Sequence, residues 1–149
     1  MVLDGCYSCT VESSGELPPW QRIVVTDHWR VAHAFDTSLP GWLVAVPREH
    51  VESLAEIKPD AAAELGPLLH DLSRALGQAT GCVKTYVMLY AEAEGYAHVH
   101  FHVVPRMADQ PETERGPRVF ARLGVPESDQ VPEAERDQLA HDITEALGR

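Results

Sequence analysis

The 149-residue chain is 44% hydrophobic and has 12 basic against 23 acidic side chains, a formal net charge of -11. This acidic balance repels a phosphate backbone, so no nucleic-acid partner is predicted. No apolar run approaches the roughly 20 residues of a membrane-spanning helix, so no membrane association is predicted either. We expect a cytoplasmic protein with one domain, residues 1–149.

Three apolar-rich runs, at 22–26, 29–35 and 42–46, predict an antiparallel meander of strands. From residue 59, leucines and alanines recur at spacings of three and four, which is typical of a helix that ends near Gly77 to Gly81. Pro67 should bend or interrupt the early turns of that helix.

Two further strands are predicted at 83–90 and in the histidine-rich run 98–104, joined by a connection of hairpin length. The stretch 108–132 is rich in Pro, Gly and charge, and Val119, Phe120 and Leu123 are its expected anchoring points. Helical spacing of apolar residues predicts a terminal helix over 132–147. Strands on both sides of one long helix indicate an α+β fold with an antiparallel sheet.

Cys6 and Cys9 form a Cys-x-x-Cys pair near the start of the chain. Three cysteines are too few for a disulfide scaffold, and in a cytosolic protein this spacing favours metal binding or catalysis. A tetrahedral structural site needs two further N or S ligands, while Cys82 lies alone. A thioredoxin-like redox pair is disfavoured because no βαβ pattern follows, and two ordinary small hydrophobic residues are the remaining alternative.

His98, His100 and His102 alternate along one predicted strand. Residues two apart point to the same face, so the three histidines should share a face with Tyr96, while the apolar residues between them pack on the helix. At a rise of about 3.3 Å per residue, the backbones of His98 and His102 lie roughly 13 Å apart, too far for one metal ion to hold all three side chains. The histidines therefore serve at least two purposes, unless they are simply polar positions on a solvated strand.

The run "HVHFHVV" at 98–104, followed by Pro105-Arg106, resembles the alternating signature of the histidine triad (HIT) superfamily of nucleotide hydrolases and transferases. The cysteine pair and "PGWLVAVPREH" at 40–50 are similar to further motifs of that family. The resemblance covers about residues 6–106 and leaves 107–149 as a C-terminal extension. It implies a HIT-like fold with an antiparallel sheet of about five strands, one long helix and a C-terminal helix, in a homodimer with the triad facing a nucleotide pocket.

The resemblance also implies roles for individual residues. His100 would attack the α-phosphorus of the nucleotide, and His102 would contact the phosphate oxygens. A backbone carbonyl would fix the tautomer of the attacking histidine. Asp36 is the candidate for the ribose hydroxyls, with turn formation as the alternative, and Tyr96 is the candidate for a phenol contact to the substrate, with packing as the alternative.

The same resemblance implies a structural Zn²⁺ ion held by four side chains. Its ligands would be Cys6, Cys9, His50 and His98. This assignment separates the histidines by purpose, because His98 faces the metal while the other two remain for chemistry.

Two features depart from the family pattern. Trp42 stands where a histidine is usual, and "AEGYA" at 93–97 lacks the usual glutamine before the triad. Glu94 in that segment would repel a long polyphosphate unless it points to solvent. The triad chemistry survives these changes, whereas substrate choice is less defined.

The leading interpretation is a hydrolase that cleaves at the α-phosphate of a nucleoside phosphate derivative, of the adenosine phosphoramidate or dinucleoside polyphosphate type, through a nucleotidyl-histidine intermediate. Nucleotidyl transfer to a phosphate or sugar-phosphate acceptor is a second interpretation. A nucleotide-binding protein with little turnover is a third. A metal hydrolase with the triad as catalytic ligands is disfavoured by the spacing above and by the lack of a carboxylate among the alternating positions.

Overall fold

A computed structural model describes residues 3–149 of the chain. Short 3-10 helices, including η1 (Pro19–Gln21) and η4 (Gly116–Arg122), lie in the connections. The α-helices and strands, in chain order, are α1 (Tyr7–Glu12), β1 (Val24–Val25), β2 (Trp29–His33), β3 (Leu43–Pro47), α2 (Pro59–Thr80), β4 (Lys84–Leu89), β5 (Phe101–Arg106) and α3 (Glu133–Ala146). The predicted α+β class is confirmed.

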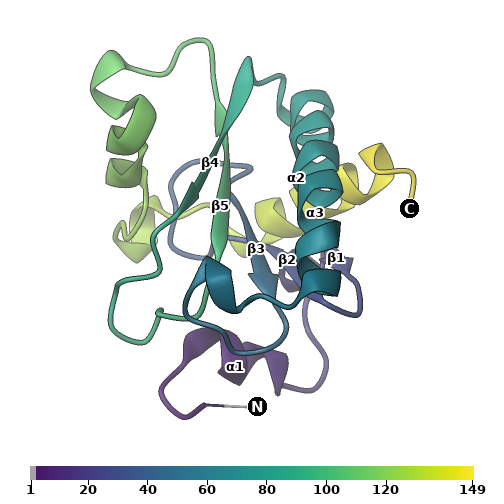
Figure 1. The fold of residues 1–149 in the computed structure, drawn as a ribbon. Coiled ribbons are helices and arrows are strands. Elements are labelled where there is room, and N and C mark those ends of the chain that lie inside the picture. The colour runs from purple at the N-terminus through teal and green to yellow at the C-terminus, as the bar shows by residue number, and fades with distance from the viewer. Residues whose placement is uncertain (1–2) are drawn as a thin grey trace.

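The strands form one antiparallel sheet of five strands in the order β1-β2-β3-β5-β4 (Figure 1). The meander predicted for the first three strands is present, and β4 pairs with β5 as the short connection indicated. Helices α2 and α3 lie on one side of the sheet, and the segment between β5 and α3 lies on the other (Figure 1).

The strand with the histidines begins later than predicted. β5 starts at Phe101, which pairs with Ala45, and β3 ends at Pro47, which has no amide hydrogen to continue the ladder. The Pro47 carbonyl instead accepts a hydrogen bond from the His98 ring at 2.7 Å, and the Val99 amide donates to the Val51 carbonyl. The expectation that all three histidines share one face is therefore wrong for His98.

The core between the sheet and α2 contains the apolar side chains that alternate with the histidines. Val99, Phe101 and Val103 are buried there together with Leu72 and Leu76 of α2. This confirms that the apolar face of the histidine segment packs on the helix. A second cluster on the opposite side of the sheet is made by Ala34, Leu39, Trp42, Val104 and Val119, with Phe120 and Leu123 packed against it.

Helix α2 is continuous over 22 residues, so the predicted interruption at Pro67 is wrong. Pro67 deprives the carbonyl of Ala63 of its amide partner, but both residues are exposed and water can satisfy that carbonyl. The helix ends as predicted, at Gly81 in the left-handed conformation with φ of 73°. Within residues 3–149, no helix is long and apolar enough to cross a membrane.

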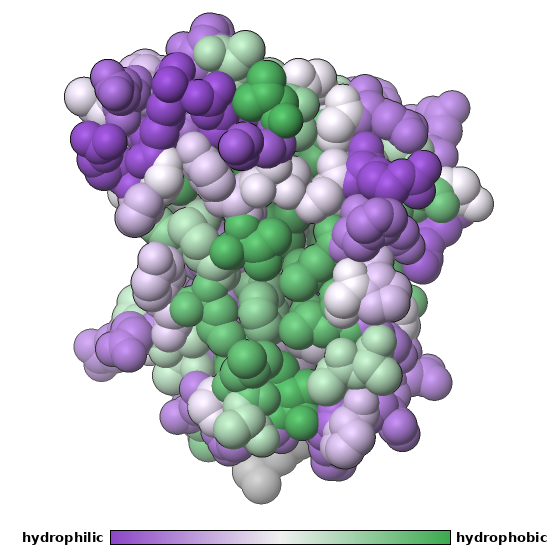
Figure 2. Space-filling model, turned by 45° about the horizontal axis from the view of Figure 1, so that its top comes forward, coloured by the Kyte–Doolittle hydropathy of each residue, from purple (hydrophilic) through white to green (hydrophobic). Residues whose placement is uncertain are grey.

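β4 forms one edge of the sheet and leaves hydrophobic side chains uncovered. Val87 is 45% exposed, and Val83, which directly precedes the strand, is 53% exposed. Figure 2 shows one face of the molecule on which hydrophobic residues gather in the centre between hydrophilic borders. An exposed sheet edge with apolar side chains is a surface suited to association.

The packing of α2 on the sheet predicts the effect of truncating a core leucine. Leu72 is fully buried, so Leu72→Ala should lower the free energy of unfolding by about 2–5 kcal/mol through lost burial and the cavity left behind. Leu54 is 55% exposed, and Leu54→Ala is the matched control with an expected change below about 0.5 kcal/mol. Urea denaturation measures both, and equal losses in the two variants would contradict this description of the core.

Candidate functional site

Four side chains from three parts of the chain meet in one cluster, which we call the Cys2His2 cluster. Cys6 and Cys9 come from the start of α1, His50 follows β3, and His98 precedes β5. Their donor atoms all lie within 4.8 Å of one another. Sequence resemblance predicted this set of residues, and the structure brings all four together.

Distances in the cluster match those between ligands of a tetrahedral zinc ion. Zn–N bonds of about 2.05 Å and Zn–S bonds of about 2.3 Å place two nitrogens about 3.4 Å apart and a nitrogen and a sulfur about 3.6 Å apart. The two imidazole Nδ1 atoms, of His50 and His98, are 3.2 Å apart. The Sγ atom of Cys6 lies 3.6 Å from His98 Nδ1, and that of Cys9 lies 3.3 Å from His50 Nδ1.

The hydrogen bonds of the two histidines fix where their protons lie. His98 Nε2 donates to the Pro47 carbonyl at 2.7 Å, and His50 Nε2 donates to the Glu52 carboxylate at 2.8 Å. In the neutral rings each Nδ1 therefore carries a lone pair, and a cation between these two atoms, 3.2 Å apart, would remove the repulsion of the facing lone pairs. With four protein ligands and no open position, the donor set fits a structural zinc ion.

The cluster also fixes one wall of a neighbouring pocket. Helix α1 is held by its two cysteines and by a hydrogen bond from the Tyr7 amide to the Gly95 carbonyl at 3.0 Å. Tyr7 and Ser8, which lie between the cysteines in sequence, line the pocket. The metal ligands thus position part of the pocket without being part of it.

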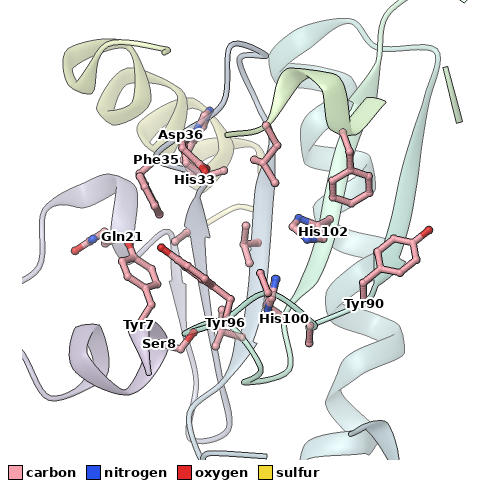
Figure 3. A pocket seen from close by; sticks show the side chains of 18 of the residues that line it. Tyr7, Ser8, Gln21, His33, Phe35, Asp36, Tyr90, Tyr96, His100 and His102 are labelled. Atoms are coloured by element: carbon pink, nitrogen blue, oxygen red, sulfur yellow. Dashed lines mark hydrogen bonds between the residues drawn. The ribbon is translucent and has the colours of Figure 1, made fainter. Parts of the chain in front are cut away.

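The pocket itself is a cavity of about 620 Å³. It lies on the side of the sheet away from α2, because its lining includes Val44 and His102, which alternate with residues of the core under α2. Its lining includes all of the residues proposed for catalysis and substrate binding: Asp36, Tyr96, His100 and His102. Figure 3 shows the two histidines in the middle of this pocket, and we call them the histidine pair. His98 is absent from the lining residues, in keeping with its place in the Cys2His2 cluster.

His100 is held in the tautomer that suits a nucleophile. Its Nδ1 lies 2.8 Å from the carbonyl oxygen of His98, and because a carbonyl only accepts, Nδ1 carries the proton. The lone pair is therefore on Nε2 of a half-buried ring. The resemblance implied a backbone carbonyl in this role, and the structure shows that it belongs to a residue of the Cys2His2 cluster.

His102 is held in the complementary state. The indole N–H of the fully buried Trp42 donates to His102 Nδ1 at 3.0 Å, so the proton of the neutral ring lies on Nε2. Burial, with a smaller contribution from the charge of His100, lowers the pKa of His102 to about 3. Because the ring is neutral near pH 7, it supplies an N–H donor and no positive charge.

The comparisons with known proteins agree with this arrangement. The sequence pattern of the HIT domain matches residues 18–109, which is more than half of the chain. The chain belongs to the HIT domain family. The resemblance read from the histidine run is confirmed, and no curated protein matches the sequence of this HIT protein at a significant level.

Solved structures show the same fold at low sequence identity. A Zn-bound histidine triad family protein from Mycobacterium smegmatis is 17% identical, with a TM-score of 0.68 over 96% of this chain and 93% of that one. A histidine triad protein from Sinorhizobium meliloti is 25% identical, with a TM-score of 0.68 over 84% of this chain and 87% of that one. A uridylyltransferase mutant is 20% identical, with a TM-score of 0.67 over 96% of this chain but 47% of that one.

Sequence reasoning on this HIT protein left several lining and supporting residues unassigned. Glu52, two residues after His50, orients that ligand, and the His-x-Glu spacing is a weak signal for it. Trp42 was noted only as a departure, although its indole N–H serves the histidine pair. Glu94 was expected to face the substrate or solvent; it is exposed and Glu92 lines the pocket instead.

His33 was left open between core and pocket, and the structure shows it buried, with both ring nitrogens bonded, in a position that also lines the pocket. Its Nδ1 donates to the Ala34 carbonyl at 2.7 Å, and its Nε2 accepts from the Gly41 amide at 2.9 Å. Burial lowers the pKa of His33 to about 4. Gly41 has a φ of 92°, and an added Cβ there would lie 3.0 Å from a methyl of Thr80, so the turn that meets His33 requires glycine.

The Cys2His2 cluster predicts that zinc content depends on two cysteines and not on the third. Cys6→Ser and Cys9→Ser should lose bound zinc and several kcal/mol of unfolding free energy. A loss of about 3 kcal/mol corresponds to a fall in Tm of roughly 6–12 °C. Cys82→Ser is the matched control, because Cys82 lies outside the cluster. Atomic absorption and thermal unfolding with and without chelator measure the effect. Equal zinc loss in all three variants would rule out this ligand set.

The buried His33 predicts a loss of stability in mild acid. In the unfolded chain a histidine titrates near 6.5, whereas burial lowers the pKa of His33 to about 4. Between these values the unfolded state binds the additional proton, so the stabilisation is complete above pH 6.5 and falls by up to about 3 kcal/mol by pH 4.

His33→Gln should flatten the pH dependence of the free energy of unfolding by as much as about 1.4 kcal/mol per pH unit in this range. His70→Gln, at a histidine that is 72% exposed, is the control and should keep the wild-type slope. Urea titrations between pH 7 and pH 4.5 give the slopes. An unchanged slope in His33→Gln would show that this ring does not titrate as described.

Proposed function

We propose that this HIT protein hydrolyses a nucleoside phosphate derivative at its α-phosphate through a covalent nucleotidyl intermediate on His100. The observation that carries the proposal is the pair of opposite tautomers in one pocket. His100 offers a lone pair on Nε2, and His102 offers a hydrogen on Nε2. A nucleophile beside a neutral donor for the phosphoryl oxygens is what attack on phosphorus requires.

In the first step, the lone pair of His100 Nε2 forms a bond to the α-phosphorus. The bond from phosphorus to the leaving group breaks, and that group departs with the electron pair and takes up a proton from water. In the second step, water attacks the phosphorus and loses a proton, while the P–N bond breaks and returns its electron pair to His100. His102 Nε2–H donates to the phosphoryl oxygens in both steps.

The remaining lining residues would place the nucleoside. Asp36 is half-buried in the pocket wall, and burial raises the pKa of its carboxyl. As an acceptor it would take hydrogen bonds from ribose hydroxyls, and Tyr96 would offer a phenol to the substrate. Bound zinc would supply a fixed scaffold for His98, whose carbonyl in turn orients His100.

Nucleotidyl transfer to a phosphate or sugar-phosphate acceptor is the second candidate. It is supported by the likeness in fold to a uridylyltransferase mutant, a protein about twice the length of the part that matches. The two candidates share the first step and differ in what attacks the intermediate. Turnover that requires an added acceptor would favour transfer, and turnover in water alone would favour hydrolysis.

Three further properties predicted from the sequence stay predictions. The homodimer is supported by the exposed apolar edge at β4, where Val83 and Val87 are uncovered. The cytoplasmic location is supported by the placement of Cys6 and Cys9 as metal ligands. A nucleotide ligand without a nucleic-acid partner is supported by the acidic chain and by the pocket that contains the histidine pair.

Replacing the proposed nucleophile tests the function directly. Incubation with adenosine phosphoramidate, diadenosine polyphosphates and ADP-sugars should leave an acid-labile nucleotidyl adduct on His100, detected by mass spectrometry. His100→Ala should lose the adduct and lower kcat roughly 10³-fold or more, because the covalent route is lost.

His70→Ala is the matched control, since His70 is an exposed histidine on α2 and should keep wild-type turnover. Nucleotide binding without adduct or product on any substrate would argue for a binding protein. Wild-type turnover by His100→Ala would remove His100 from the reaction.

A further inference from the structure

The pocket has aromatic side chains on both sides of the histidine pair. On one side, the ring of Tyr7 lies 5.2 Å from that of Phe35 and 5.5 Å from that of Tyr96. Asp36 adjoins these rings, as Figure 3 shows, and we call this side of the pocket the Asp36 side. This side has both the rings to stack on a base and the carboxylate to meet a ribose.

The opposite side, which we call the Phe120 side, extends directly from the histidine pair. The ring of Phe120 lies 5.0 Å from that of His102 and 5.5 Å from that of Tyr90. Figure 3 places Tyr90 across the histidine pair from Tyr7. Pro117, which lies in the same short helix as Phe120, adds apolar surface to the lining. A group attached to the far side of the α-phosphorus would meet carbon atoms here.

Much of the Phe120 side lies outside the part of the chain that defines the family. The HIT domain match ends at residue 109, whereas Pro117 and Phe120 follow it. Both residues belong to η4 (Gly116–Arg122). The shape of this side therefore depends on the segment that follows the matched domain.

The segment that bears Phe120 is firmly attached to the domain. Arg122 donates to the Ser38 hydroxyl at 2.6 Å and to its carbonyl at 3.0 Å, and Thr37 donates to the Arg122 carbonyl at 2.9 Å. Val119 is fully buried beneath it. The wall is thus formed before a ligand binds, which lowers the ordering cost of binding.

The charges that line the pocket disfavour a polyphosphate. Among the described lining residues, Arg30 is the single lysine or arginine, and it is 4% exposed and bonded to Glu12 and to the Gln21 carbonyl. Asp36 and Glu92 add carboxyl groups to the lining. A chain of phosphates would find acidic groups and no free cation to neutralise it.

We propose that the Phe120 side binds the leaving group, and that this group is apolar and ring-bearing and is joined to the nucleoside through a single phosphate. The inference rests on the proposed function and specifies its substrate class. The phosphate is the only anionic group that the histidine pair must support, and the aromatic wall buries the departing ring. When the bond to phosphorus breaks, the leaving group takes the electron pair and a proton from water, as above.

The test compares three substrates that share adenosine and differ in the leaving group. These are the adenosine 5′-phosphoramidates of benzylamine and of methylamine, and diadenosine tetraphosphate. The benzyl compound should exceed the methyl compound about 10- to 100-fold in kcat/KM, because only its ring fills the Phe120 side. Diadenosine tetraphosphate should be the slowest.

Variants test whether the preference for the benzyl compound depends on the Phe120 side. Phe120→Ala and Tyr90→Ala should each lower the benzyl-to-methyl ratio about tenfold, mainly through the benzyl substrate. Tyr90 is 56% exposed, so its variant keeps the test informative if Phe120→Ala does not fold. Glu92→Lys should raise kcat/KM for diadenosine tetraphosphate, and Leu54→Ala is the distant control.

Three results would overturn the inference while leaving the proposed function intact. The first is a wild-type preference for diadenosine tetraphosphate. The second is a benzyl-to-methyl ratio of kcat/KM that is unchanged in both aromatic variants. The third is an equal loss of kcat/KM on all three substrates in these variants, which would place the nucleoside at the Phe120 side. In each of these cases the His100 adduct still forms. Absence of that adduct on every substrate would instead overturn the proposed function, and this inference with it.

Discussion

His98 is the residue through which the rest of the site is connected, because three of its polar atoms bond in three directions. Its Nδ1 faces the Cys2His2 cluster, its Nε2–H donates to the Pro47 carbonyl at the end of β3, and its backbone carbonyl accepts a hydrogen bond from His100 Nδ1–H. A metal ligand, a strand end and the proposed nucleophile are thereby held in one arrangement. The buried position of His98 leaves this arrangement little freedom to relax.

The fold and the metal ligands could largely be predicted from the sequence because their signals are local or strongly patterned. Helical spacing identified α2, and a Cys-x-x-Cys pair with the histidine run indicated the cluster. The departure of residues 98–100 from the strand could not be predicted. It depends on Pro47 in another strand, which ends the ladder and then accepts from a side chain.

The composition of the pocket was predictable only in part, since it depends on contacts between distant segments. Phe120 was expected to anchor its segment, but nothing in its local sequence shows that it faces His102. Trp42 was recognised as a departure from the family pattern, yet its hydrogen bond joins residues 60 positions apart. The acidic net charge of the chain, by contrast, does reappear in the pocket as carboxylates without a free cation.

The buried indole N–H of Trp42 offers a way to observe local opening of the structure around His102. Its N–H is bonded to His102 and has no access to solvent in the closed structure. Such a proton exchanges with deuterium only when the surrounding packing opens locally or the whole chain unfolds. The exchange rate of this single proton therefore reports the free energy that holds Trp42 packed against His102, without any substrate present.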